Sequence, residues 1–315
     1  MSRCGEPREK TTKGTQSKGR EKLITRASAA DAARLCAMLR IAQEKSAANA
    51  PVPADCTAAP LAADVFTLCM RAAYRCYGTQ HTNAAFYFVS VQTADKADEK
   101  SRASDGQAVP SAGKASDGLL YVQGRSALYA GPIQDAQELE AFLQLLQIKT
   151  FQSNSMLLPD WADMPRYLMH LPAGTLPDVT AVAVDEHPSL WNLAHSGVLA
   201  DIDPDAWYAD ACARVNHGVA DIRAVAMPDA AGALQYVATA GAYAMDAQSV
   251  FLTAVATKPE YRGRGFACTI LSSLARSYAD KDAYLLCAPP RRSFYEQLGF
   301  VLARPVCEYH APPDI

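Results

Sequence analysis

The sequence predicts an α/β fold with a mixed, mostly antiparallel sheet flanked by helices. Residues 219–227 alternate apolar and polar side chains, as a half-buried strand does, and a short turn leads into a second strand at 233–243. A third stretch, 250–255, is apolar and rich in β-branched residues, which indicates a buried strand. A glycine-containing loop and an amphipathic helix at 266–278 follow it. This order of elements places a cleft beside the end of the central strand.

The first half of the chain predicts a second α/β arrangement ahead of this unit. In chain order we expect a strand at 23–27, a helix at about 29–39 capped by Ser28, a helix at 65–77, a strand at 85–91, paired strands at 119–122 and 126–130, and a helix at 135–146. Four prolines between 159 and 177 mark the crossing into the second half. That half should open with a strand at 179–184 and two helices, at 189–194 and 206–215.

Two polar segments have no periodicity that would predict a helix or a strand. Residues 1–21 are rich in Ser, Thr, Gly and basic side chains, which is typical of a disordered tail. A basic tail can contact nucleic acid, but a solvated tail is the interpretation we favour. Residues 93–118 are similarly polar and predict a flexible surface insertion between two strands.

The composition is that of an ordinary globular protein. The chain has 315 residues, of which half are hydrophobic and a fifth are charged, and its net charge is −3. This charge argues against nucleic acid as a partner, and no apolar run approaches the length of a membrane span. The nine cysteines are odd in number and form no C-x-x-C pair, so we expect small buried hydrophobes and no metal site. A cytoplasmic location follows as the default expectation.

The loop after the central strand has the chemistry of an anion site. Pro259 ends the strand near Thr257, and the segment Arg262-Gly263-Arg264-Gly265 leads directly into the helix. The first turn of a helix presents unpaired backbone amides, and glycines let a ligand approach them, so a phosphate or diphosphate fits. A dinucleotide fingerprint would need a glycine where Cys268 stands, and a P-loop would need Gly-Lys-Ser/Thr, so neither motif is present.

Two motifs together resemble the GNAT N-acetyltransferase superfamily. The segment from Arg262 to Ala267 is similar to the acyl-CoA loop of that family, which reads Arg or Gln, two residues, Gly, one residue, then Gly or Ala. Further along, 294–300 reads Phe-Tyr-Glu-Gln-Leu-Gly-Phe and resembles the late helix of the family with its tyrosine. The close resemblance covers about the last quarter of the chain. It implies a GNAT fold for the second half and acetyl-CoA as co-substrate.

The resemblance also implies roles for particular residues. The diphosphate would lie on the amides of the loop, formed by Arg262, Gly263, Arg264, Gly265, Phe266 and Ala267. The pantetheine arm would pair with backbone groups of Val255 and Thr257 along the central strand. The amide of Thr257 would polarise the thioester carbonyl. Tyr295 would act as the general acid that protonates the leaving thiolate, since a tyrosine is protonated at neutral pH.

The residue that accepts the proton of the amine is less clear from the sequence. Family members often have a carboxylate on the central strand, and 250–255 contains none. We prefer His217, which precedes the strand at 219–227. The other candidates for this base are Asp221, Asp246, Glu308 and His310. Water could also accept the proton. Trp191, Trp207 and Tyr208 are candidates for lining an acceptor pocket, or for core aromatics.

The sequence therefore predicts an acetyl-CoA-dependent N-acetyltransferase that transfers an acyl group to an amine by direct attack in a ternary complex. The alternative is a non-catalytic acyl-CoA-binding sensor or interaction module. We expect a GNAT domain at 176–315 and a GNAT-like, non-catalytic α/β domain at 22–175. The acceptor would be a small-molecule or peptide amine, with no membrane partner, and the oligomeric state stays open.

Overall fold

The structure is a computed structural model, and it describes residues 24–39, 64–82, 84–90, 118–132, 135–153, 158, 161–175, 177, 182–200 and 202–312. The helices are α1 (Ala32–Leu39), α2 (Val65–Tyr77), α4 (Ala136–Leu145), α5 (Leu190–Ala194), α6 (Pro204–Asn216), α7 (Phe266–Ser277) and α8 (Arg292–Glu296), with 3-10 turns η1 (Ala29–Asp31), η4 (Pro259–Tyr261) and η5 (Pro289–Arg291). The strands are β1 (Ile24–Arg26), β2 (Ala84–Val89), β3 (Gly118–Gln123), β4 (Ser126–Ala130), β5 (Thr150–Ser153), β6 (Ala162–Leu171), β7 (Asp221–Pro228), β8 (Leu234–Met245), β9 (Ser249–Thr257), β10 (Asp282–Cys287) and β11 (Val301–His310).

The eleven strands that the structure describes form one sheet, in the order β1-β2-β3-β4-β5-β11-β6-β10-β9-β8-β7. Two pairs are parallel, β4 with β5 and β9 with β10, and each is joined through a helix, α4 or α7. The other neighbours are antiparallel. The predicted fold class, a mixed and mostly antiparallel sheet flanked by helices, is confirmed.

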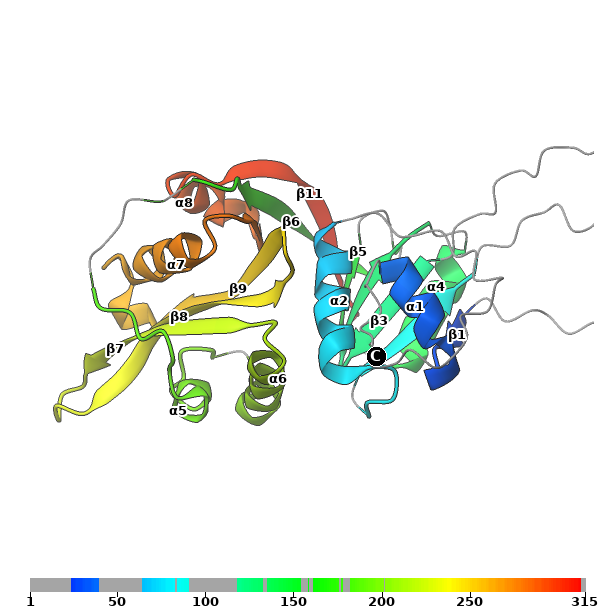
Figure 1. Cartoon of the computed structure of the whole chain (residues 1–315), viewed down its shortest axis with the longest axis horizontal. Helices are drawn as coiled ribbons and strands as arrows, with labels where there is room; N and C mark the ends of the chain where they lie inside the picture. The colour runs from blue at the N-terminus through cyan, green and yellow to red at the C-terminus, as the bar shows by residue number, and fades with distance from the viewer. Residues whose placement is uncertain are drawn as a thin grey trace, which may run out of the picture.

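Helices cover both faces of the sheet. In the second half, α7 packs on one face through Ile270, Leu271 and Leu274, which are buried against strands β8, β9 and β10. Helices α5 and α6 lie on the opposite face, where Trp207 and Ala211 form a separate buried cluster (Figure 1). Helix α2 stands between the two halves and packs on β8 (Figure 1). These helices show the 3.6-residue apolar spacing that the sequence predicts.

The two halves exchange strands. Strand β6 comes from the first half of the chain but lies between β10 and β11, and β11, the last strand, lies between β6 and β5 (Figure 1). Hydrogen bonding in the sheet therefore crosses the boundary expected at residue 175, and that boundary stays a prediction. The tail 1–21 lies outside the described residues, as does the insertion 93–118 except Gly118, which begins β3.

The sequence analysis missed β5 and β6, and the strand expected at 179–184 lies partly outside the described residues. Prolines had marked 159–177 as a crossing, yet Pro165 lies inside β6. Pro165 pairs with Cys307 of β11, whereas the pairing of β6 with β10 begins only at Tyr167. The β10 side of β6 is therefore unpaired at Pro165, and proline, which has no N–H, is tolerated at such an edge. The part of 179–184 that the structure describes is not a strand; Asp185 makes an isolated bridge to Ala224 instead.

A buried arginine joins the two halves. The Arg214 side chain on α6 is 10% exposed and donates to Asp210 Oδ2 (2.8 Å), to the carbonyl of Tyr243 (3.0 Å) and to Gln123 Oε1 (3.3 Å). Gln123 ends β3 in the first half, and its amide nitrogen also donates to Asp210 (2.7 Å). The Tyr77 hydroxyl of α2 completes the cluster by donating to Asp210. The first half therefore holds α6 in place.

Candidate acyl-CoA site

A cavity of about 820 Å³ opens where β9 and β10 separate. The two strands pair in parallel only as far as Leu252 with Leu285. Beyond that point both strands line the cavity, through 253–257 on one side and 286–288 on the other. The gap exists because the strands diverge while β9 keeps its pairing with β8 as far as Thr257.

The backbone of Thr257 faces this gap. Lys258 donates its amide to the Val237 carbonyl of β8 at 2.9 Å, so Lys258 points toward β8. Successive residues of an antiparallel strand direct their amides and carbonyls to alternate sides. The backbone amides and carbonyls of Val255 and Thr257 therefore point away from β8, toward the cavity. A β-bulge lies just before, at Ala254, whose φ of 54° is in the left-handed region and turns the strand.

The loop after β9 presents a row of unpaired amides. Gly263 and Gly265 have φ of 75° and 81°, which glycine adopts readily, and Gly265 is the N-cap of α7. Within the residues that the structure describes, the amides of 263–268 donate to no protein acceptor. These amides line the cavity at the positive end of the α7 dipole. A diphosphate fits this arrangement.

The corresponding crossover in the first half is built differently. Helix α4 joins β4 to β5 as α7 joins β9 to β10, but its N-cap is Asp135. The Asp135 carboxylate accepts the amide of Glu138 at 2.9 Å, and Glu138 adds a second negative charge to the first turn. This helix end is already capped by an anion. The α7 end has no side-chain cap and no acidic residue in its first turn.

The two arginines of the loop are held by the loop itself. Arg262 Nε donates to the carbonyl of Thr257 at 3.2 Å. Arg264 Nη2 donates to the carbonyl of Glu260 at 3.2 Å, and its guanidinium lies 5.1 Å from the ring centroid of Tyr261. Both side chains therefore place positive charge beside the unpaired amides, at one end of the cavity.

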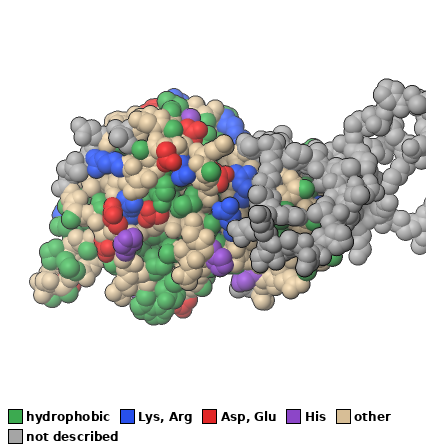
Figure 2. All heavy atoms as spheres, in the orientation of Figure 1, with side chains coloured by type: hydrophobic (Ala, Val, Ile, Leu, Met, Phe, Trp, Pro, Cys, Tyr) green, Lys and Arg blue, Asp and Glu red, His purple; other side chains and the backbone are tan. Residues whose placement is uncertain are grey.

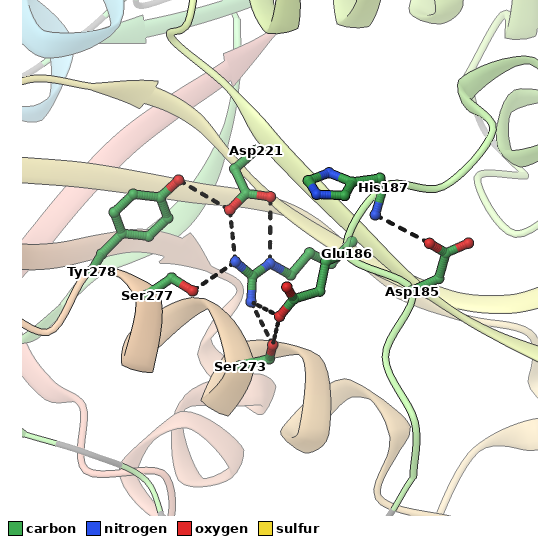
Figure 3. Close-up of polar contacts among 8 residues, drawn as sticks. Asp185, Glu186, His187, Asp221, Ser273, Ser277 and Tyr278 are labelled. Carbon is green, nitrogen blue, oxygen red and sulfur yellow. Dashed lines mark hydrogen bonds and ion pairs between the residues drawn. The ribbon is translucent and has the colours of Figure 1, made fainter.

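A polar cluster fixes α7 to the edge of the sheet. The guanidinium of Arg223 on β7 is buried and donates to Asp221 (2.9 Å), Glu186 (3.1 Å), and Ser277 (2.7 Å) as well as Ser273 of α7. The Tyr278 hydroxyl donates to Asp221 at 3.0 Å. Figure 3 shows these side chains converging from the strand, the helix and the segment 185–187. The cluster lies outside the cavity lining and anchors the helix whose first turn faces the cavity.

Tyr295 lies on α8 and lines the same cavity as Thr257 and the loop. Its side chain is 8% exposed and packs edge-on against Phe294 and Phe300. Burial raises the pKa of Tyr295 to about 12, with a smaller contribution from Cys287, while Arg291 opposes the shift. The phenol is therefore protonated at neutral pH, as a proton donor must be.

The preferred base, His217, is not brought to the cavity. It is the C-cap of α6, is exposed, and its Nδ1 contacts the carbonyl of Ala213 at 2.8 Å. The other candidates are engaged elsewhere: Asp221 by Arg223 and Tyr278, Asp246 by Arg71 (2.6 Å), and Glu308 by Arg166 (2.7 Å), Gln152 (2.6 Å) and His310 (2.9 Å). In its described part, the cavity lining contains no Asp, Glu or His.

The acceptor side of the cavity differs from the expected aromatic pocket. Trp207 is buried in the cluster around α6, and Trp191 is 52% exposed and contacts the His195 ring at a tilt. Neither tryptophan lines the cavity. The wall is formed instead by the segment between α5 and α6, through Val198, Leu199, Ala200 and Ile202. Sequence analysis also missed Arg291 and Cys287 in the lining. Arg291 stands four residues before Tyr295, a spacing that could have pointed to it.

The sequence also led to expectations about cysteines, metal sites and membrane-spanning helices. The seven cysteines that the structure describes are all unpaired. Among the described residues, no group of His, Cys, Asp and Glu could hold a metal ion, and no helix has the length and apolarity to cross a bilayer. Figure 2 shows acidic and basic side chains interspersed over the visible face of the second half.

Comparison with known proteins identifies the class. The family described as acetyltransferase (GNAT) domain matches residues 226–302, which span the central strand, the loop, α7 and Tyr295. The resemblance to the GNAT family that the sequence predicted is therefore confirmed for residues 226–302. No curated protein sequence matches the chain.

Solved structures show the same fold over nearly the whole chain. A Drosophila protein is 10% identical with a TM-score of 0.52, and the match covers 92% of this chain and 99% of that one. A tandem GNAT protein from the clavulanic acid biosynthesis pathway is 13% identical with a TM-score of 0.50, covering 91% of this chain and 97% of that one. A putative GNAT acetyltransferase of Novosphingobium aromaticivorans is 18% identical, covers 59% of this chain and 82% of its own, and has a TM-score of 0.43. The first two likenesses concern the fold of both halves.

Proposed function

We propose that the chain is an acetyl-CoA-dependent N-acetyltransferase in which an amine attacks the acyl group directly, in a ternary complex. One observation carries the proposal: the part of β9 beyond its pairing with β10, the loop before α7 and Tyr295 all line one cavity. The amides would hold the diphosphate, and the backbone of Val255 and Thr257 would align the pantetheine arm. These are the residues that the resemblance to the family had implied.

In this mechanism the protein would stabilise the charge on the thioester oxygen and protonate the leaving thiolate. The amide of Thr257 would stabilise the negative charge that develops on the thioester oxygen, an effect of about 2.7–4 kcal/mol for one well-placed donor. Tyr295 would protonate the leaving thiolate. Because His217 lies away from the cavity, we propose that water carries off the proton of the amine. The acceptor would be a small-molecule or peptide amine.

A second function is favoured by one specific observation. The described lining has no Asp, Glu or His to accept a proton, which suits a non-catalytic acyl-CoA sensor equally well. In that case the loop would bind the cofactor and the first half of the chain would engage a protein partner.

Calorimetry and a transfer assay over a panel of amines test both functions. For an acetyltransferase, Tyr295→Phe should lower kcat by about 10²–10⁴-fold, as loss of a general acid does, while affinity for coenzyme A stays nearly unchanged. Tyr284→Phe is the matched control, because Tyr284 lies on β10 and stacks on His170, outside the cavity lining. A sensor should bind coenzyme A and transfer to no amine. Absence of binding heat would contradict both functions.

A further inference from the structure

The charges around the cavity are all of one sign in the described lining. It contains three arginines, Arg262, Arg264 and Arg291, and no acidic side chain. A cavity of this kind gives no counter-charge to a polycationic acceptor. It instead favours an acceptor that has a negative group of its own.

Arg291 differs from the two arginines of the loop. It belongs to η5, which follows β10, and is the N-cap residue of α8. Its side chain is exposed and makes no hydrogen bond or ion pair with any residue that the structure describes. It lies near enough to Tyr295 to act on the phenol electrostatically, opposing the effect of burial on that group. Arg291 is thus an uncompensated cation beside the expected acid.

The neighbouring Arg292 has a structural role. Arg292 Nε donates to Glu296 Oε1 at 2.7 Å, and its guanidinium lies 5.8 Å from the ring centroid of Tyr167. Arg292 does not line the cavity. Arg292 is thus paired with Glu296, whereas the adjacent Arg291 lines the cavity and has no hydrogen-bond or ion-pair partner among the described residues.

We propose that Arg291 binds a carboxylate of the acceptor, so that the substrates of this site are amines that also bear a carboxylate, such as amino acids or short peptides. A guanidinium suits this task because its planar N–H groups match the two oxygens of a carboxylate. The loop arginines lie beside the amides proposed to hold the diphosphate, whereas Arg291 directly precedes the helix that carries Tyr295, the proposed acid. The inference rests on the proposed acetyltransferase function.

Matched acceptor pairs test the inference in the full-length protein. Each pair has the same amine with a carboxylate or a carboxamide: an α-amino acid with its amide, and a dipeptide with its C-terminal amide. We expect the carboxylate member to have the lower KM. Arg291→Gln should raise that KM by about 10- to 100-fold, as expected for loss of a charge-assisted pair, and leave the carboxamide nearly unchanged. Arg292→Gln is the control and should alter neither.

The readouts separate this inference from the proposed function. Equal use of carboxylate and carboxamide acceptors by the wild type would overturn the role of Arg291 but leave the acetyltransferase standing. A rise in the KM of acetyl-CoA in Arg291→Gln, without change in acceptor selectivity, would assign Arg291 to the cofactor and also overturn it. Comparison of the KM values for the amino acid and the dipeptide shows which of the two acceptors is preferred.

A binding measurement covers the case in which no acceptor is turned over. N-acetyl amino acids and their amides are titrated into the protein saturated with coenzyme A. Carboxylate-dependent binding that Arg291→Gln abolishes would support the inference even if the proposed function fails. Binding that does not distinguish the acid from the amide would overturn it.

Discussion

Tyr295 is protected from ionisation by its surroundings, and this has a consequence for pH dependence. Burial raises its pKa to about 12. A tyrosine donates a proton only in its neutral form, so a raised pKa extends the active form to higher pH. An exposed tyrosine would be half ionised at about pH 10.

We therefore expect kcat to show no loss from Tyr295 between about pH 7 and 10. The measurement is a pH profile of kcat at saturating substrates, run on the wild type and on Tyr284→Phe as a control for general alkaline effects. A decline centred clearly below pH 10 that follows the ionisation of a tyrosine would contradict the raised pKa of Tyr295.

At the scale of single elements, the two βαβ crossovers of the sheet make opposite use of a helix N-terminus. Asp135 closes the end of α4 with its own carboxylate, whereas Gly265 leaves the end of α7 open. The Arg223 cluster holds α7 against β7. An anion site thus depends on what the sequence places at one cap position.

Replacing Gly265 tests this contrast. Gly265→Asp should bring a negative charge to the α7 cap, while Gly265→Asn has the same shape without the charge, and both types tolerate the left-handed φ better than other non-glycine residues. Like charges about 4 Å apart near a protein surface repel by about 4 kcal/mol. We expect calorimetry to show coenzyme A binding at least about tenfold weaker to the Asp variant than to the Asn variant. Equal affinities would show that the diphosphate lies elsewhere.

At the scale of the whole molecule, the exchange of β6 and β11 makes the two halves depend on each other. Strand β6 supplies the neighbour of β10, and β5 supplies the outer neighbour of β11. Arg214 adds a buried polar link between α6 and Gln123. Strands β10 and β11 therefore pair with strands that lie outside residues 176–315.

Two fragments measure this dependence. A fragment of residues 176–315 lacks β6, so β10 and β11 lose their shared partner and expose unpaired strand edges. We expect it to aggregate or to unfold without a cooperative transition by circular dichroism. A fragment of residues 158–315 retains β6 and should be more soluble and more stable. Cooperative unfolding of the shorter fragment, with affinity for coenzyme A equal to that of the full chain, would contradict this view.

Local pattern was sufficient to predict the loop and α7. The strand end at Pro259, the glycines at 263 and 265 and the helical spacing after them act over a few residues, and the structure places these elements where the pattern predicts them. Helix α2 was likewise predicted to the residue, because its apolar face and its polar cap lie within one short segment. For such elements the chain's own sequence sets the conformation.

Pairing between strands that are far apart in the sequence could not be predicted from local pattern. Strand β6 contains Pro165 and looks like a connection, and it is a strand only because β10 and β11, more than a hundred residues away, pair with it. The position of His217 outside the cavity, and that of Arg291 within it, follow from how α6 and η5 pack and not from their neighbours in sequence. Strand exchange and cavity lining depend on contacts between remote segments, and a single sequence read along its length does not contain their geometry.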